Sequence, residues 1–229
     1  MGAMQPKEVA GRRAAQFVES GMTLGLGTGS TVHFTLVAIA EAIRERGLNV
    51  RGVPTSLDTE RKAREMGIPL VELGEVAAID LTIDGADEID GAFAMIKGGG
   101  GALLREKVVA SLSRREVIVV GPDKVVERLG TTFALPVEVV PFARPAVGLA
   151  LARLGCEPKL RAAKDGSTYR TDNGNEILDC RFVRGIADAA RLERDIDAIP
   201  GVVESGLFIG LAHTLVIGHP DGRAEVRQL

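Results

Sequence analysis

The first half of the chain alternates short apolar runs with segments of helical periodicity, and this alternation restricts the folds that it can adopt. Residues 6–19 have helical spacing, and Gly21 ends them before a short apolar run. The stretch MTLGLGTGST then leads into an apolar helical segment through Ile43 that closes at Gly47. Further strands are expected over residues 50–54, 69–73, 79–84 and 117–120. Strands that alternate with helices predict a parallel α/β sheet, which binds ligands at the carboxyl ends of its strands.

The pattern changes after Gly130. It predicts a strand over residues 133–140, a helix over 144–154, strands over 157–163 and 176–182, a helix over 187–199 and a strand over 202–208. This β-α-β-β-α-β order is typical of a ferredoxin-like unit. The tail HTLVIGHPDGRAEVRQL predicts two short strands around a Pro-Asp-Gly turn that return to the first sheet. We therefore expect a Rossmann-like α/β domain over residues 4–130 plus 209–229, and a smaller ferredoxin-like α+β domain over 131–208.

Charge and cysteine content exclude several classes of protein. The 28 Lys and Arg residues and 31 Asp and Glu residues are scattered and give a net charge of −3, which argues against a nucleic-acid partner. Cys156 and Cys180 form no CxxC motif, so we expect reduced thiols and neither a disulfide framework nor a zinc site. No apolar run reaches the roughly 20 residues of a membrane span, and no signal-peptide region is evident. We expect a cytoplasmic protein whose chemistry involves small molecules.

The first candidate site loop is GLGTGST, residues 25–31, between a predicted strand and a predicted helix. Its backbone amides and hydroxyl groups could hold a phosphate against the helix N-terminus. It lacks the third glycine of the dinucleotide motif and the lysine of a P-loop, which disfavours nicotinamide and ATP. The alternative is a tight turn with only a structural role.

The second candidate loop, DGADEID, is acidic. Asp84 comes at the carboxyl end of a predicted strand, and Asp87, Glu88 and Asp90 follow at once. Neighbouring carboxylates raise one another's proton affinity, which suits proton transfer. The alternatives are a solvated acidic turn and a weak magnesium site; the spacing does not fit an EF-hand.

The third candidate loop, KGGGGALLREK, contains four consecutive glycines at residues 98–101, and a helix is expected to begin near Ala102. Glycine lets bare backbone amides approach an oxyanion or a phosphate closely. Glu106 shares the apolar face of the predicted helix, whereas Arg105 and Lys107 project elsewhere. A desolvated carboxylate is a better base once ionised. The alternative is an ordinary surface glutamate beside two cations.

Other polar residues carry less information. His33, His213 and His219 are too far apart in the sequence to indicate a triad or a metal cluster. Lys124 follows a predicted strand in the stretch GPDK, where it could contact a phosphate or be exposed to solvent.

Together, GLGTGST, DGADEID, MIKGGGGALLREK, LPVEV and TDNGN…ILD resemble the type A ribose-5-phosphate isomerase family, nearly end to end. The resemblance implies interconversion of ribose 5-phosphate and ribulose 5-phosphate in the pentose phosphate pathway, without a metal or an organic cofactor. The partner that it implies is a small-molecule sugar phosphate. It also implies a homodimer, which in some members pairs into a homotetramer.

The resemblance also assigns residues. It implies that Glu106 accepts the proton and that Asp84, Asp87 and Lys97 are the acid and base groups that face the sugar. The residues that match its substrate-binding positions are Lys7, Thr28, Gly29, Ser30, Thr31, Gly85, Ala86, Gly98, Gly99, Gly100 and Lys124.

Two other functions occur on a related α/β architecture. An amino-sugar-phosphate deaminase would turn over glucosamine 6-phosphate. A sugar-phosphate sensor would bind without turnover and would carry a helix-turn-helix, for which the residues before Gly21 are too few.

Overall fold

The computed structural model describes residues 5–229, which divide into two compact units. The first contains the described residues up to Ala86 together with Arg105–Val125 and Leu211–Leu229. The second contains Asp87–Leu104 and Val126–Gly210. The predicted domain boundaries stay a prediction; they place residues 87–104 and 126–130 differently from these units, and the first predicted residue, Met4, lies outside the described residues.

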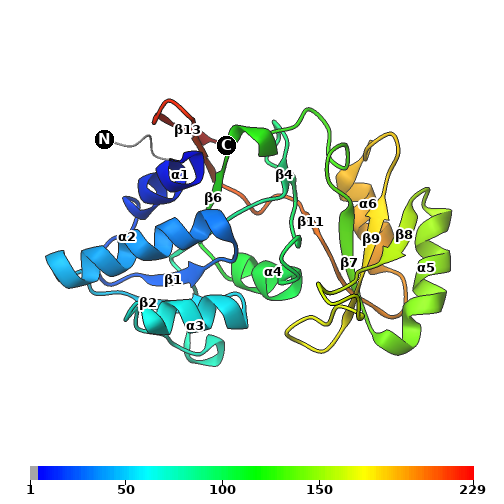
Figure 1. The fold of residues 1–229 in the computed structure, drawn as a ribbon, viewed down its shortest axis with the longest axis horizontal. Helices are drawn as coiled ribbons and strands as arrows, with labels where there is room; N and C mark the ends of the chain where they lie inside the picture. The colour runs from blue at the N-terminus through cyan, green and yellow to red at the C-terminus, as the bar shows by residue number, and fades with distance from the viewer. Residues whose placement is uncertain (1–4) are drawn as a thin grey trace. The chain divides into compact units, whose positions relative to one another are not determined.

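The first unit is built on a mixed sheet, drawn in Figure 1. Within residues 5–229 its six strands have the order β13-β12-β6-β3-β1-β2, and every pairing is parallel except that of β12 with β13. The strands are β1 (Thr23–Leu26), β2 (Arg51–Pro54), β3 (Leu81–Asp84), β6 (Glu116–Val120), β12 (Thr214–Gly218) and β13 (Ala224–Gln228). The predicted parallel sheet is therefore confirmed, and the tail does return to it.

Helices cover both faces of this sheet (Figure 1). They are α1 (Pro6–Ala15), α2 (Ser30–Arg46), α3 (Leu57–Glu65) and α4 (Leu103–Ser111), with 3-10 turns η1 (Leu73–Glu75) and η2 (Pro122–Lys124). Ala10 of α1 and Leu36 of α2 pack against Leu81 and its neighbours on one face. Val109 of α4 packs with Ile79 and Val53 in a separate cluster. The apolar side chains thus bury both faces, as a parallel sheet requires.

The predicted strand over residues 69–73 is wrong. Leu70 forms a single bridge to Gly52, and the chain then enters η1. Pro69 has no N–H group to donate, and the side chains of Glu72 and Glu75 form a capping box that turns the backbone into the 3-10 helix. Local turn chemistry therefore overrides the apolar pattern here.

The second unit contains the predicted ferredoxin-like order. Its antiparallel sheet has the strand order β10-β7-β9-β8. The elements are β7 (Leu135–Val139), η3 (Pro141–Ala143), α5 (Arg144–Arg153), β8 (Glu157–Leu160), β9 (Glu176–Arg181), α6 (Ala189–Asp197) and β10 (Val202–Ser205). Val137 and Leu178 face Val147 of α5 and Ile196 of α6 in one core. Because side chains alternate along a strand, Pro136 and Asp179 lie on the face opposite these helices.

The predicted strand over residues 202–208 is divided at Gly206. After it, β11 (Leu207–Phe208) pairs with β5 (Met95–Ile96), which pairs with β4 (Glu88–Ile89). The Gly206 N–H donates to Pro136 O at 2.7 Å, and its carbonyl accepts from Lys97 N at 2.9 Å. A Cβ at this position would overlap both neighbours. The glycine thus lets one chain segment join two sheets and brings residues 87–104 into the second unit.

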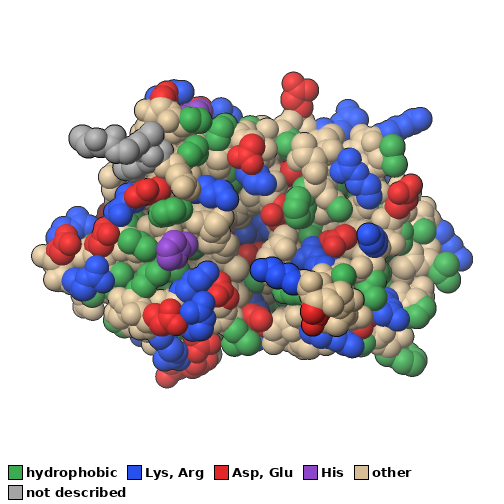
Figure 2. All heavy atoms as spheres, viewed as in Figure 1, with side chains coloured by type: hydrophobic (Ala, Val, Ile, Leu, Met, Phe, Trp, Pro, Cys, Tyr) green, Lys and Arg blue, Asp and Glu red, His purple; other side chains and the backbone are tan. Residues whose placement is uncertain are grey.

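Charged side chains of both signs are mixed on one face of the molecule. Figure 2 shows Lys and Arg side chains interspersed with Asp and Glu over the visible face. Among residues 5–229, no helix combines the length and the apolar character that crossing a membrane requires.

Candidate functional site

The loop between β1 and α2 contains a cluster of hydroxyl groups. Thr28 Oγ1 lies 2.8 Å from the hydroxyl oxygens of both Thr55 and Ser56, and 3.2 Å from that of Thr59. Thr59 Oγ1 donates to Gly27 O at 2.8 Å. These contacts hold the loop in one conformation and connect the ends of two neighbouring strands, β1 and β2.

The N-terminus of α2 has the features of an anion site. Its N-cap is Gly29, which has no side chain to occupy the first N–H groups and adopts a φ of 119°. Lys7 Nζ donates to Ser30 Oγ at 2.9 Å, so a cation from α1 lies at the same helix end. Free N–H groups, the helix dipole and a lysine together favour a bound anion. The structure therefore brings Lys7, Ser30 and the Thr28 loop together.

Asp84 ends β3, as predicted, and it is fully buried. Its Oδ1 accepts from the backbone N–H groups of Thr28 at 3.0 Å and of Gly85 at 2.7 Å. A Cβ at Gly27 would overlap this carboxylate. The absence of a side chain at Gly27 is therefore what allows the carboxylate of β3 to lie against the loop after β1.

The acidic residues after Asp84 separate into different roles. Glu88 is buried, and its carboxylate accepts from the N–H groups of Gly130, Thr132 and Phe133 at 2.5–2.7 Å. Asp90 accepts from two N–H groups of its own turn. Both carboxylates hold backbone in place, so the solvated acidic turn is not the arrangement found. Within residues 5–229, no three His, Cys, Asp or Glu side chains gather as a metal site.

Asp87 and Lys97 belong to the second unit. Asp87 Oδ2 accepts from Gly99 N at 2.7 Å, which connects the acidic loop to the glycine run. Lys97 is only 2 % exposed, and its Nζ lies 5.3 Å from the centre of the Phe208 ring. A buried amine above a ring face keeps a fixed position because few rotamers fit there.

Glu106 lies on the buried face of α4, as predicted. It is 6 % exposed, and Leu103, Val109 and Ala110 on the same face are buried. The alternative of a surface glutamate is therefore wrong. A carboxylate in this position is held by the helix on which it lies, which suits a group that must meet a substrate carbon in one geometry.

Lys124 ends η2, immediately after β6, at the carboxyl edge of the first sheet. Its side chain is about one-third exposed, and Nζ lies 3.7 Å from a carboxylate oxygen of Asp123. This weak ion pair leaves the lysine able to turn toward an anion.

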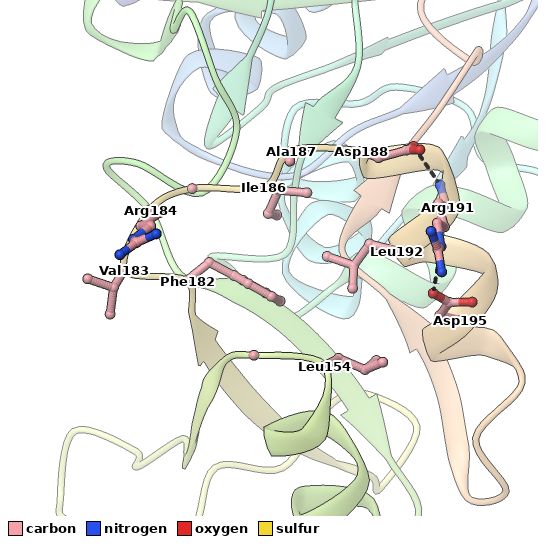
Figure 3. A pocket seen from close by; sticks show the side chains of 12 residues that line it. Leu154, Phe182, Val183, Arg184, Ile186, Ala187, Asp188, Arg191, Leu192 and Asp195 are labelled. Carbon is pink, nitrogen blue, oxygen red and sulfur yellow. Dashed lines mark hydrogen bonds and ion pairs between the residues drawn. The ribbon is translucent and has the colours of Figure 1, made fainter.

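A separate cavity of about 510 Å³ lies within the second unit, between the end of α5 and the start of α6 (Figure 3). Its wall includes Leu154, Phe182 and Leu192. At its rim, Arg191 Nε lies 3.6 Å from Asp195, and its backbone N–H donates to Asp188. The lining residues include none of the predicted site residues.

Sequence reasoning missed the hydroxyl groups of Thr55, Ser56 and Thr59. All three are buried polar residues, and they follow β2 in the stretch PTSLDT. A polar run directly after the end of a parallel strand could have revealed them, because such ends converge at one edge of the sheet.

Comparison with known proteins identifies one family over most of the chain. The family model of ribose 5-phosphate isomerase A (phosphoriboisomerase A) matches residues 51–222. The ribose-5-phosphate isomerase A of Gloeobacter violaceus is 53% identical over 217 residues, covering 94% of this chain and 93% of its own. That of Thermosynechococcus vestitus is 48% identical and covers 98% and 96%.

Solved structures of this family are similar in fold over almost the whole chain. A ribose 5-phosphate isomerase A from Methanocaldococcus jannaschii has a TM-score of 0.93 at 37% identity, covering 97% of this chain and 98% of its own. A D-ribose-5-phosphate isomerase in complex with phospho-erythronic acid has a TM-score of 0.95 at 33% identity, covering 99% and 100%. Sequence and fold agree over both units, and the chain belongs to the ribose 5-phosphate isomerase A family of isomerases.

Proposed function

We infer that this chain interconverts D-ribose 5-phosphate and D-ribulose 5-phosphate by proton transfer through an enediolate. The observation that carries the inference is the buried carboxylate of Glu106 on α4, directly after the glycine run, in a chain of this family. A relative was solved with phospho-erythronic acid, a sugar-acid phosphate whose carboxylate resembles an enediolate in shape and charge.

Glu106 is proposed as the base that removes the proton from carbon 2 and returns it to carbon 1. One carboxylate can perform both transfers, because the two carbons are adjacent in the substrate. Its place on an apolar helix face supports this role, since partial desolvation strengthens a carboxylate as a base.

Lys97 and the amides of Gly98 and Gly100 are proposed to stabilise the negative charge that develops on the enediolate oxygens, while the Gly99 amide holds Asp87. A fixed ammonium group and fixed N–H groups are effective here because they need no reorganisation during the reaction. Asp84 and Asp87, with Gly85 and Ala86 between them, are proposed to assist ring opening and proton movement between oxygens. The hydrogen bonds of both carboxylates to backbone N–H groups support a fixed position.

The phosphate is proposed to bind at the N-terminus of α2. It would contact Lys7, Ser30, Thr31 and the Gly29 amide there, and Lys124 would add a second cation. These groups bind a part of the substrate that does not react, so they contribute to affinity in the ground state and the transition state alike. The Thr28 amide already donates to Asp84, so Thr28 contributes by holding the loop in place.

The assay is direct. Purified protein is mixed with ribose 5-phosphate, and ketose formation is followed over time, with glucosamine 6-phosphate as the competing substrate. Ketose from the pentose phosphate alone supports the proposal. Ammonia release from the amino sugar, or binding of both compounds without turnover, contradicts it.

We also propose that the protein acts as a homodimer through an apolar stripe on η3 and α5. Phe142 is 96% exposed and Leu149 67% exposed, and Pro145, Ala146 and Ala152 lie between and beyond them at helical spacing. The opposite side of α5 is already in the core through Val147 and Leu151. A helix with apolar side chains on two opposite sides usually packs against other protein on both sides.

A second copy of the chain is the proposed partner, because the stripe residues are uncharged and a two-fold contact would place no like charges opposite one another. Light scattering should report a dimer for the parent and a monomer for Leu149→Glu. Val183→Glu, a similarly exposed position of the second unit, is the matched control and should stay dimeric. A monomeric parent contradicts the proposal, and a tetramer would indicate further pairing of dimers.

Cytoplasmic location and a place in the pentose phosphate pathway are proposed from the family.

A further inference from the structure

Side chains of the second unit hold the carbonyl groups of the glycine run from one side. Arg161 Nη1 donates to Gly98 O at 2.8 Å and to Gly99 O at 3.3 Å. The Tyr169 hydroxyl donates to Gly100 O at 3.2 Å. Gly101 N also donates to Gly98 O at 2.9 Å, which closes a turn. Three successive carbonyl groups therefore have fixed directions.

Fixed carbonyl groups also fix the direction of the amides. In a trans peptide the N–H group points opposite to the C=O group of the same plane. When Arg161 holds the carbonyls of Gly98 and Gly99, the N–H groups of Gly99 and Gly100 point away from it. The Gly99 N–H donates to Asp87 Oδ2 at 2.7 Å. The contact with Arg161 thus directs the amides and also positions one proposed catalytic carboxylate.

Arg161 is itself held rigidly. Its Nε donates to Asp179 Oδ2 at 3.0 Å and its Nη2 donates to Asp179 Oδ1 at 2.5 Å. Such a bidentate pair fixes the plane of a guanidinium group. The backbone N–H of Arg161 also donates to Ile177 O on β9, and its side chain is only 13% exposed. The face of the sheet opposite α5 and α6 therefore serves as a platform for the glycine run.

Tyr169 completes the contact. The Arg161 guanidinium carbon lies 5.8 Å from the centre of its ring. Burial raises the pKa of Tyr169, so the hydroxyl group keeps its proton and remains a donor at any pH at which the enzyme would be assayed. A Cβ at Gly101, which has a φ of 80°, would overlap this hydroxyl group.

We propose that Arg161, locked by Asp179 and flanked by Tyr169, is a positioning residue for the isomerisation. It holds the Gly99 amide on Asp87 and aims the Gly100 amide at the oxygen on which the enediolate charge develops. The proposal rests on the proposed function, because it assigns the Gly100 amide to the transition state. A merely structural ion pair would make the same contacts but would not couple Arg161 to transition-state affinity.

The test compares Arg161→Lys and Arg161→Gln with the parent. Lysine keeps the charge but cannot span two carbonyl groups and a carboxylate. Misplacement of catalytic groups by about 1 Å costs about 10²-fold in rate, so kcat should fall by about that factor while KM for ribose 5-phosphate changes little. Affinity for phospho-erythronic acid should fall in parallel with kcat.

Arg181→Ala is the matched control. Arg181 lies on β9, two residues after Asp179, but donates to Thr131 O at 3.1 Å, away from the glycine run. It should keep the parent kcat and the parent affinity for phospho-erythronic acid. Tyr169→Phe, which removes one hydroxyl group, should cost about 3- to 10-fold in kcat. It keeps the proposal testable if both Arg161 variants fail to fold.

Amide spectra separate this inference from the proposed function. In ¹⁵N spectra, the resonances of Gly99 and Gly100 should shift or broaden in Arg161→Lys and stay unchanged in Arg181→Ala. An inactive parent would overturn the proposed function alone, and unmoved glycine resonances would overturn the positioning of the amides. Folded Arg161 variants with parent kcat and parent analogue affinity would overturn the role of Arg161 in catalysis.

Discussion

Replacing Gly27 with alanine tests how the first unit holds Asp84. The new Cβ would lie 2.6 Å from Asp84 Cα and closer still to its carboxylate. Carbon atoms without a bond between them settle at about 3.5–4.0 Å, so the two strand ends must separate by about 1 Å. The carboxylate cannot simply turn aside, because part of the overlap is with backbone.

The cost follows from the hydrogen bonds that this movement disturbs. Asp84 Oδ1 accepts from Thr28 N and Gly85 N. A hydrogen bond to a charged group contributes about 1.5–3 kcal/mol, so disturbing both lowers the free energy of unfolding by about 3–6 kcal/mol. For a chain of this length each kcal/mol lowers the Tm by about 2–4 °C, so a loss of about 3 kcal/mol corresponds to roughly 6–12 °C. Because Asp84 is a proposed acid group, kcat should also fall by about 10²-fold.

Thermal unfolding by circular dichroism and the ketose assay measure the two effects. Gly74→Ala is the matched control, because a Cβ at Gly74 meets no heavy atom within 4 Å. It should leave both Tm and kcat unchanged. A Gly27→Ala protein with the parent Tm and kcat would refute the argument that this glycine exists to admit the Asp84 carboxylate.

Three further outcomes are expected. Lys124→Ala should raise KM more than it lowers kcat, because a phosphate contact acts on ground and transition states alike; an unchanged KM removes Lys124 from the site. The hydrogen bond from Arg12 lowers the pKa of Glu41, so its stabilising effect is present above pH about 4.3 and is lost as the pH falls through the lowered value. Glu41→Gln should therefore lower the free energy of unfolding by at most about 1 kcal/mol at pH 7, and this loss should shrink as the pH falls below about 4.3; a loss that does not change with pH contradicts this. Activity should survive EDTA, since the proposed chemistry uses only side chains and amides; loss that magnesium restores would show a metal requirement.

Local patterns in the sequence were sufficient for much of the fold. The alternation of strands and helices, the position of Asp84 at the end of β3 and the buried face of Glu106 all follow from periodicity within one element. The ferredoxin-like order was visible for the same reason. Such features depend on residues only a few positions apart, so they can be recognised in a single sequence.

Long-range partners were not visible. Glu88 and Asp90 belong to the same acidic run as Asp84, yet the N–H groups that hold Glu88 lie 42–45 residues further along the chain. Arg161 meets Gly98 across 63 residues, and no local pattern distinguishes it from a surface arginine. The division of the predicted strand over residues 202–208 at Gly206 likewise depends on its contacts with Lys97 and Pro136. Contacts of this kind depend on the folded arrangement of the chain.

The role of Glu106 as the base is the central claim, and exchange of the carbon 2 hydrogen tests it most directly. Glu106→Gln keeps the size of the side chain but cannot accept a proton. Loss of a general base typically costs about 10²- to 10⁴-fold in rate, so kcat should fall by at least about 10²-fold while affinity for phospho-erythronic acid changes little. In deuterated water the parent should exchange the carbon 2 hydrogen of ribose 5-phosphate, and the variant should stop doing so. A variant that loses turnover but still exchanges this hydrogen at the parent rate would contradict the account and assign the proton transfer to another group.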